Sequence, residues 1–246
     1  MVRRLLKRLK WIIFICAIFS LIIYAGTIIL LDGMNIIDAG AATGSSSNIN
    51  TAITDEELKE LIKKSDSEIW QLLTGTAYDS KPTLSQVPES LMEPRITDIT
   101  VPVRTANGDS TTVFQVNQAL AGLFTAFFKD LYDQCPDFYV SNSGGYVFKD
   151  VNNGTTGAMS AHAVGAAVDI NDEYNPWQAE PYTKEQYNSL GEPEKHYVIY
   201  YDSPMVQIAK KYTLSWGGFW TRKDGMHFSF IGDWTRARTL QEYGIN

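Results

Sequence analysis

Cysteine is scarce in this sequence, and its scarcity limits the chemistry that the chain can carry. The two cysteines are Cys16 and Cys135. Because Cys16 lies inside a long apolar run, no disulfide is expected within the rest of the chain. A lone cysteine is usually a small buried apolar side chain, so we do not expect Cys135 to act as a nucleophile.

Basic residues are also few beyond the N-terminus. Five of the 21 Lys and Arg residues fall within the first ten positions, where no acid is present. The other 16 face 28 acidic residues, which gives a formal charge of −12 after Lys10. Contacts to phosphates need clusters of Lys and Arg, so the sequence argues against nucleic acid as a partner.

Charged residues are absent from the run between Trp11 and Leu31. At about 1.5 Å per residue, a helix of this length crosses a hydrocarbon core of ~30 Å. The basic flank should stay in the cytoplasm, so we expect residues 1–31 to form a cytoplasmic flank and a membrane anchor, with the rest outside the cell. A cleaved signal peptide is the alternative, since Ala39-Gly40-Ala41 suits a signal peptidase. Both interpretations export the rest of the chain.

Composition divides the exported part into three segments. Residues 32–53 are rich in Gly, Ala, Ser, Thr and Asn and are expected to form a flexible linker. Residues 54–94 form a lead-in segment, in which a capping-box pattern opens a helix expected from Asp55 to Leu73. Residues 95–246 remain as the main domain.

Apolar periodicity predicts an α+β fold for the main domain. Asn107-Gly108 is expected to form the tight turn of a hairpin, and Asn117 to cap the helix that ends before Pro136. The later elements expected are a strand at Phe138–Ser141, a short helix at Ser203–Lys211 and a strand at Met226–Ile231. Because strands and helices do not alternate regularly, we expect a small mixed or antiparallel sheet with flanking helices.

Two of the three histidines lie in two unusual segments, which are Ser160 to Asp169 and Trp216 to Phe228. A catalytic zinc site takes three ligands from His, Asp or Glu and keeps one position open for water. His162, Asp169 and His227 would supply that set.

The expected strand gives this hypothesis physical support. Alternation would send Met226, Phe228 and Phe230 into the core and turn His227 to the opposite face. Asp224, ahead of the strand, would be left to take a proton from water on the metal. Taken as spacings alone, these residues are more typical of surface aspartates and hydrogen-bonded histidines than of a metal site.

The surrounding motifs resemble those of peptidase family M15, which includes VanY-type D,D-carboxypeptidases and endolysin-like L-alanyl-D-glutamate endopeptidases. They are Ser-x-His-x-x-Gly-x-Ala-x-Asp, Trp-Gly-Gly-x-Trp and Asp-x-x-His-Phe, between about Phe138 and Phe230. The resemblance implies an LAS-type fold, Zn²⁺ held by His162, Asp169 and His227, Asp224 as catalytic base, and the peptidoglycan stem peptide as substrate.

The Trp-Gly-Gly-x-Trp element with an Asp base is more similar to the endopeptidases, since the carboxypeptidases usually carry Glu-x-Trp-His. An L-Ala-D-Glu endopeptidase is therefore expected. A D-Ala-D-Ala carboxypeptidase on the same scaffold and a non-catalytic module that binds the cell wall or a partner are the alternatives.

The sequence departs from this family in one basic residue. The relatives usually carry an Arg before the Ser-x-His segment that stabilises the oxyanion, whereas no Arg lies between Arg104 and Arg222. Lys149 falls about where that Arg is expected, but an ammonium lacks the guanidinium fork. We expect Lys149 and Ser160 to contact substrate, with a solvated loop cation and a turn-stabilising hydroxyl as the alternatives.

The other candidate residues lie around these motifs. Trp216, Phe219 and Trp220 can either line a cleft or fill the core. His196 lies in a polar stretch and is expected to be exposed.

Overall fold

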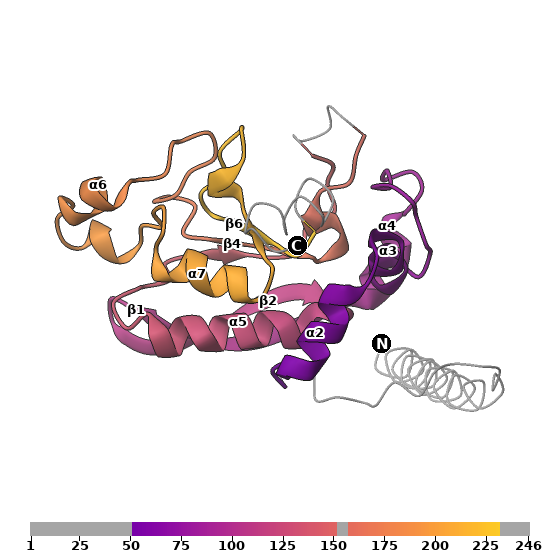
Figure 1. Cartoon of the computed structure of the whole chain (residues 1–246), viewed down its shortest axis with the longest axis horizontal. Coiled ribbons are helices and arrows are strands. Elements are labelled where there is room, and N and C mark those ends of the chain that lie inside the picture. Colours follow the sequence, from indigo (N-terminus) through magenta and orange to yellow (C-terminus); the bar gives the residue numbers. More distant parts are fainter. Residues whose placement is uncertain (1–50, 152–156, 232–246) are drawn as a thin grey trace, which may run out of the picture. The chain divides into compact units, whose positions relative to one another are not determined.

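The computed structural model describes residues 51–151 and 157–231 (Figure 1). The expected membrane anchor and most of the linker lie outside these residues. In the described ranges, no helix is both long enough and apolar enough to cross a membrane. All described residues belong to one compact unit that spans residues 48–246.

Two helices form where the sequence predicted a single one. They are α2 (Asp55–Lys63) and α3 (Asp66–Thr74), followed by a short α4 (Glu89–Met92) and the 3-10 turn η1 (Glu93–Arg95). The first helix stops because Ser65 opens a second capping box with Glu68 and satisfies the backbone N–H groups of α3. Because the apolar residues of both helices follow the same period, the sequence did not reveal the boundary between them.

The hairpin consists of β1 (Ile96–Thr105) and β2 (Gly108–Asn117), paired antiparallel along their whole length. Its turn lies one residue earlier than expected, because Ala106 and Asn107 form it. The positive φ falls on Gly108 alone, at 106°. A Cβ there would meet nothing within 4 Å, so the glycine is needed for its backbone conformation and not for space.

The central helix follows the hairpin directly. It begins with the 3-10 turn η2 (Gln118–Leu120) and continues as α5 (Ala121–Gln134), ending ahead of Pro136 as expected. On one side Phe128 stacks on Phe114 of β2, with ring centroids 4.3 Å apart. On another side, the ring centroid of Phe127 lies 5.5 Å from that of Phe228, a residue of the second sheet described below. Figure 1 shows α5 running alongside the hairpin with α7 (Pro204–Lys211) beside it.

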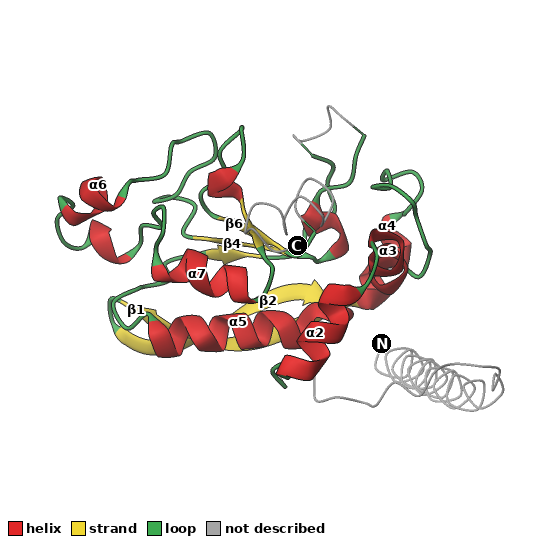
Figure 2. Cartoon of the chain, viewed as in Figure 1, coloured by secondary structure: helices red, strands yellow, loops and turns green. Residues whose placement is uncertain are grey.

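The second sheet carries the motifs and has the strand order β3-β4-β6-β5, with every neighbouring pair antiparallel. Figure 2 shows its two central strands, β4 and β6, in yellow. The α+β class with small antiparallel sheets is confirmed. Its strands are β3 (Ser143–Gly144), β4 (Ala167–Ile170), β5 (Ser215–Trp216) and β6 (His227–Ser229). The connections contain η3 (Ala161–Val164), α6 (Lys184–Asn188), η4 (Glu194–His196) and η5 (Gly217–Phe219).

The strand expected at Phe138–Ser141 does not form. Its backbone donors go to two different segments, because the Tyr139 N–H bonds to the carbonyl of His196 and the Val140 N–H to that of Arg104, each at 2.8 Å. In a strand, alternate residues bond to the same neighbour, but the Ser141 N–H bonds to the side-chain oxygen of Asn171 at 2.8 Å and not to the backbone near His196, so no ladder forms. The sequence also overestimated β6, which covers three residues of the expected Met226–Ile231.

Asn117 joins three parts of the domain at one buried position. Its side-chain amide donates to the carbonyls of Leu73 in α3 and Val164 in η3, both at 3.0 Å. Its side-chain oxygen accepts from the N–H of Ala119 and so caps the central helix as expected, while its own N–H bonds to the Gly165 carbonyl at 2.8 Å. The lead-in helices are thereby fixed to the segment that carries His162.

We expect Asn117→Ala to lower the free energy of unfolding by about 2–4 kcal/mol, since it removes a helix cap and leaves buried carbonyls unpaired. Urea unfolding of the purified protein measures the loss. Asn188→Ala, at the exposed C-terminal end of α6, is the control and should stay within about 0.5 kcal/mol of the parent. Equal stabilities for the two variants would contradict the junction role of Asn117.

Candidate active site

The three predicted metal ligands converge on one point. His162 comes from η3, Asp169 from β4, and His227 from β6, where it pairs directly opposite Asp169. His162 Nε2 lies 3.2 Å and His227 Nδ1 lies 3.0 Å from the same carboxylate oxygen of Asp169, and the two nitrogens are 3.0 Å apart. Both imidazoles are buried, with 4% and 3% of their surface exposed.

This donor set fits a zinc ion. One ligand atom from each of the three side chains falls within 4.8 Å of the others. Tetrahedral zinc with bonds of about 2.0–2.1 Å separates its ligand atoms by roughly 3.3 Å. The observed separations of 3.0–3.2 Å are close to that value. Nitrogen and carboxylate oxygen are also the ligand types that zinc accepts.

The carboxylate of Asp169 is held in its charged form. Burial alone would raise the pKa of Asp169, but hydrogen bonds and charge attraction from His162 and His227 outweigh it and hold the pKa well below its usual range. An ionised carboxylate beside two imidazoles is the state that a metal cation requires of its ligands.

His162 is oriented by a backbone carbonyl. Its Nδ1 lies 2.6 Å from the carbonyl oxygen of Gly145. Because a carbonyl can only accept, Nδ1 must carry the proton in this contact, which leaves the Nε2 lone pair directed at the other two ligands. A Cβ at Gly145 would stand 2.3 Å from the Gln115 carbonyl oxygen of β2, so only glycine lets this backbone lie so close to the hairpin.

The Trp-Gly-Gly element brings Asp224 beside the ligands. The Asp224 N–H bonds to the Gly217 carbonyl at 3.0 Å, and the Asp224 carbonyl accepts from His227 at 3.2 Å. A Cβ at Gly217 would lie 2.4 Å from the Asp224 carbonyl oxygen, and one at Gly218 would lie 2.4 Å from the Trp216 indole. Both glycines are therefore needed for the loop to fold back against β6.

A cavity of about 200 Å³ lies at this point. Its lining includes all six site residues predicted from the sequence, namely Lys149, Ser160, His162, Asp169, Asp224 and His227. The hydroxyl of Ser160 also accepts from the His162 N–H at 3.3 Å and caps η3, so the turn-stabilising role expected as an alternative is present at the cavity wall.

The cavity also contains residues that the sequence did not indicate. Asp150 is buried and accepts from the Gly157 N–H at 3.0 Å. Met226 lines the cavity instead of entering the core as expected, because it precedes the start of β6 and the alternation of that strand does not reach it. Trp177 contributes an indole that is 45% exposed. Trp177 lies outside the three motifs, and none of them points to it.

The aromatic residues of the motif have separate roles. Trp216 is fully buried in the core, whereas Trp220 lines the cavity with its ring 5.0 Å from that of His227. Phe219 is partly exposed and lies off the cavity. His196 lies elsewhere and, contrary to expectation, is half-buried because it stacks on Tyr139 and its Nδ1 donates to the Asp137 carbonyl at 2.6 Å.

Comparison with known proteins gives one family. Residues 153–230, about a third of the chain, match the model of a peptidase M15 family described as D-alanyl-D-alanine carboxypeptidase. The matched segment contains every predicted site residue except Lys149. No curated protein and no solved structure matches the chain.

We expect Gly145→Ala to weaken zinc binding by about 10- to 100-fold, because the added methyl displaces the carbonyl that orients His162. Competition with a chelating zinc indicator measures the affinity. Gly144→Ala is the control, since a Cβ at that neighbouring position would meet only the Asp169 Cβ at 4.0 Å, which is an ordinary contact. Equal affinities for the two variants would rule out this orienting role.

Cys135 is expected to be chemically inert in the folded protein. Burial raises the pKa of its thiol to about 11, with a small opposing effect of Arg104. At pH 8 the thiolate fraction is then about 100-fold below that of a thiol with a pKa of 9. Alkylation by iodoacetamide, followed by mass spectrometry of the Cys135 peptide, should be slow until urea is added. Rapid labelling of the folded protein would contradict this expectation.

Proposed function

We propose that this chain is a metallopeptidase of the M15 type that hydrolyses an amide bond in the stem peptide of bacterial peptidoglycan, at the L-Ala-D-Glu position. The support is that residues 153–230 match a peptidase M15 family model and that a possible metal site lies in this segment. The observation that carries the proposal is the meeting of two imidazoles and one carboxylate in a cavity that Asp224 also lines. Metal-assisted hydrolysis needs a metal site and a base within reach of one substrate, and these residues are candidates for both roles.

His162, Asp169 and His227 are the proposed zinc ligands. Two neutral imidazoles and one carboxylate leave a bound Zn²⁺ with a net positive charge, which suits attack on an uncharged amide. When bound, the ion would supply Lewis-acid polarisation of the scissile carbonyl and lower the pKa of a coordinated water.

Asp224 is the proposed general base. It would accept a proton from the attacking water and return it to the leaving amine, which otherwise departs poorly. The contacts with Gly217 and His227 fix its backbone, so its carboxylate is held at the cavity without rearrangement. Lys149, on another wall, would stabilise negative charge on the carbonyl oxygen as a point charge, and the Ser160 hydroxyl would contact substrate.

Hydrolysis of a D-Ala-D-Ala bond is the second candidate function, because the description of the matching family names that activity. The endopeptidase proposal rests on the Asp base and on the Trp-Gly-Gly-x-Trp element. A non-catalytic binding module is a weaker candidate, since it would not require Asp224 in the same cavity as a complete ligand set.

We also propose that the enzyme acts outside the cytoplasm while anchored by residues 1–31. The support for this is the basic flank and the apolar run of the sequence. An anchored enzyme of this kind would act on the wall close to the membrane.

Asp224→Ala should keep the bound zinc and lower the rate of hydrolysis by about 100- to 10,000-fold, the usual contribution of a general base. His162→Ala should lose both zinc and activity. Asp172→Ala is the control, because its carboxylate contacts Asn142 at the surface and lies off the cavity. Zinc content is measured by atomic emission, and activity on defined muropeptides by mass spectrometry. Normal turnover by Asp224→Ala would refute the role of the base.

The products of the parent protein separate the candidate functions. Cleavage between L-Ala and D-Glu supports the endopeptidase, whereas release of terminal D-Ala supports the carboxypeptidase. Zinc-loaded protein that yields no product from either substrate would favour the binding module.

A further inference from the structure

Trp220 is a large side chain that packs directly against a proposed zinc ligand. The centroid of its ring lies 5.0 Å from that of His227, and the two ring planes are inclined at 54°. Both side chains are buried, since 4% of Trp220 and 3% of His227 is exposed. Trp220 also belongs to the lining of the catalytic cavity. The indole is therefore a part of the cavity wall against which the His227 imidazole packs.

Two hydrogen bonds hold the indole in place. Its Nε1 donates to the side-chain oxygen of Ser215 in β5 at 3.0 Å, and the Trp220 backbone N–H bonds to the Gly217 carbonyl at 3.1 Å. Ser215 pairs with Ser229 of β6, two positions after His227. Trp220 is thus tied to the strand next to the one that carries the ligand. Its ring cannot leave His227 without breaking a buried hydrogen bond.

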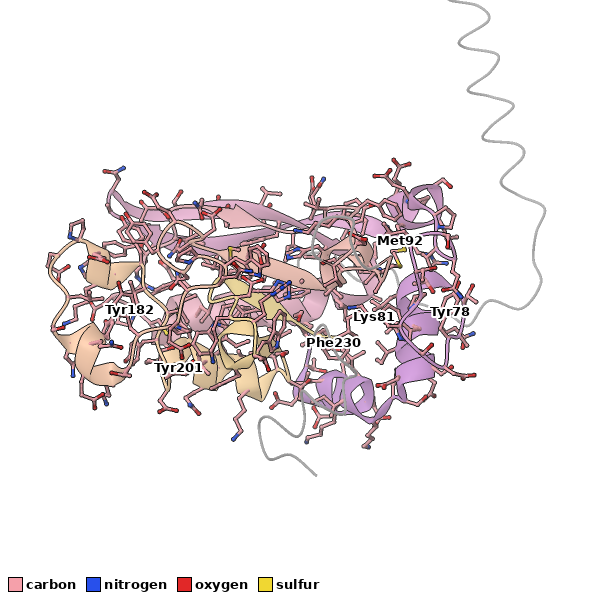
Figure 3. The ribbon with its side chains drawn as sticks, turned by 90° about the horizontal axis from the view of Figure 1, so that it is seen from above. Tyr78, Lys81, Met92, Tyr182, Tyr201 and Phe230 are labelled. Carbon is pink, nitrogen blue, oxygen red and sulfur yellow. The ribbon has the colours of Figure 1, made fainter. Side chains whose placement is uncertain are left out.

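The loop that carries Trp220 is supported at Gly218. The Gly218 carbonyl accepts from the Lys223 ammonium at 3.1 Å, and the Tyr201 hydroxyl, labelled in Figure 3, lies 3.1 Å from the same oxygen. The Tyr201 ring also packs on the edge of Trp216, with ring centroids 5.6 Å apart. The backbone beneath the indole is therefore itself fixed, so the indole can act as a rigid neighbour.

His227 needs an outside contact to hold the angle of its ring. The terminal torsion of a histidine side chain is broad, so β6 sets where the imidazole starts but not how its plane is turned. Its Nδ1 must face the Asp169 carboxylate and His162 Nε2, each 3.0 Å away. His162 is oriented by a hydrogen bond to the Gly145 carbonyl. For His227, close packing against a fixed indole can serve the same purpose.

We propose that Trp220 is a positioning residue of the metal site, which holds the His227 imidazole in its ligating orientation and keeps water from that side of the ligand. This inference deepens the proposed function and rests on its zinc site. A ligand has to turn away before a bound ion can leave. The indole should therefore act mainly on the rate of zinc release.

Trp220→Leu should weaken zinc binding by about 10- to 100-fold, because the fixed ring face beside His227 is lost. Competition with a chelating zinc indicator measures the affinity. A large excess of the indicator measures the rate of release, which should rise by the same factor. Trp220→Phe should recover most of the loss, because it keeps an aromatic face toward the imidazole although it lacks the N–H.

Ser215→Ala is a smaller change that tests the same contact without altering the ring. It removes the acceptor of the indole N–H, so the release of zinc should become about three- to tenfold faster. This variant carries the test if Trp220→Leu does not fold. Release at the parent rate from Ser215→Ala and from Trp220→Leu, wherever the latter folds, would refute the positioning role.

A second measurement separates positioning from support of the fold. Co²⁺ can replace zinc in protein sites, and its visible absorption depends on the geometry of its ligands. At saturating Co²⁺, Trp220→Leu should have a changed spectrum, whereas Trp220→Phe should resemble the parent. Urea unfolding of the metal-free proteins gives the loss of stability caused by the smaller side chain. If stability falls while zinc affinity and the Co²⁺ spectrum stay at the parent values, Trp220 only fills space and the inference is wrong.

Two further variants serve as controls. Trp177→Leu removes another tryptophan of the cavity lining, whose ring contacts the Arg222 guanidinium at 5.5 Å. Phe219→Leu removes the aromatic residue next to Trp220, which is partly exposed and lies off the cavity. Both should bind and release zinc like the parent. Losses of affinity equal to that of Trp220→Leu would indicate a general effect of these aromatic residues and overturn the specific role of Trp220.

The outcome for the peptidase function is distinguishable from this one. If the parent cuts stem peptide and Trp220→Leu binds zinc as tightly as the parent, the positioning role is refuted while the function stands. If the parent binds zinc in a Trp220-dependent manner but cuts no stem peptide, the function fails and the positioning role stands. A parent protein that binds no zinc would overturn both.

Discussion

The register between β4 and β6 is the constraint on which the site depends. It sets Asp169 directly opposite His227 and, one position further along, Val168 opposite Phe228. Both apolar residues are fully buried, and Phe228 contacts Phe127 of the central helix. A slip of one residue would exchange the two faces of β6, bury an imidazole in the core and expose Phe228. The apolar core therefore enforces the pairing of the two ligands.

The third ligand is positioned from the other side, by the hairpin. Two glycines near His162 let the backbone lie directly against β2. A Cβ at Gly145 would collide with Gln115, and one at Gly165 would stand 2.4 Å from the Asn117 nitrogen. Asn117 also donates to the Leu73 carbonyl and so holds the lead-in helices against the hairpin. Residues well before the matched segment 153–230 thus help to shape the site, although they carry none of its reactive groups.

Sequence and structure agree more closely on where the candidate site residues meet than on the bounds of the helices and strands, and the reason is physical. The candidate ligands lie within motifs that resemble those of peptidase family M15, and the glycines around them are needed because backbone approaches backbone, so both can be recognised in the sequence. The strand predicted at Phe138–Ser141 was wrong because the Ser141 N–H bonds to the Asn171 side chain and not to the backbone segment that Tyr139 contacts. The break at Ser65 was missed because both helices bury apolar faces of the same period. The anchor at residues 1–31 stays a prediction, as it lies outside the described ranges.

The position of positive charge bears on which bond is cut. A carboxypeptidase must hold a terminal carboxylate within about one residue of the scissile bond, which calls for a cation inside the cavity. Lys149 is the one such residue among the described lining residues, and it is the proposed partner of the carbonyl oxygen. One cation cannot serve the oxyanion and a neighbouring terminus equally well, and this is our physical reason for proposing cleavage within the peptide chain ahead of removal of its last residue.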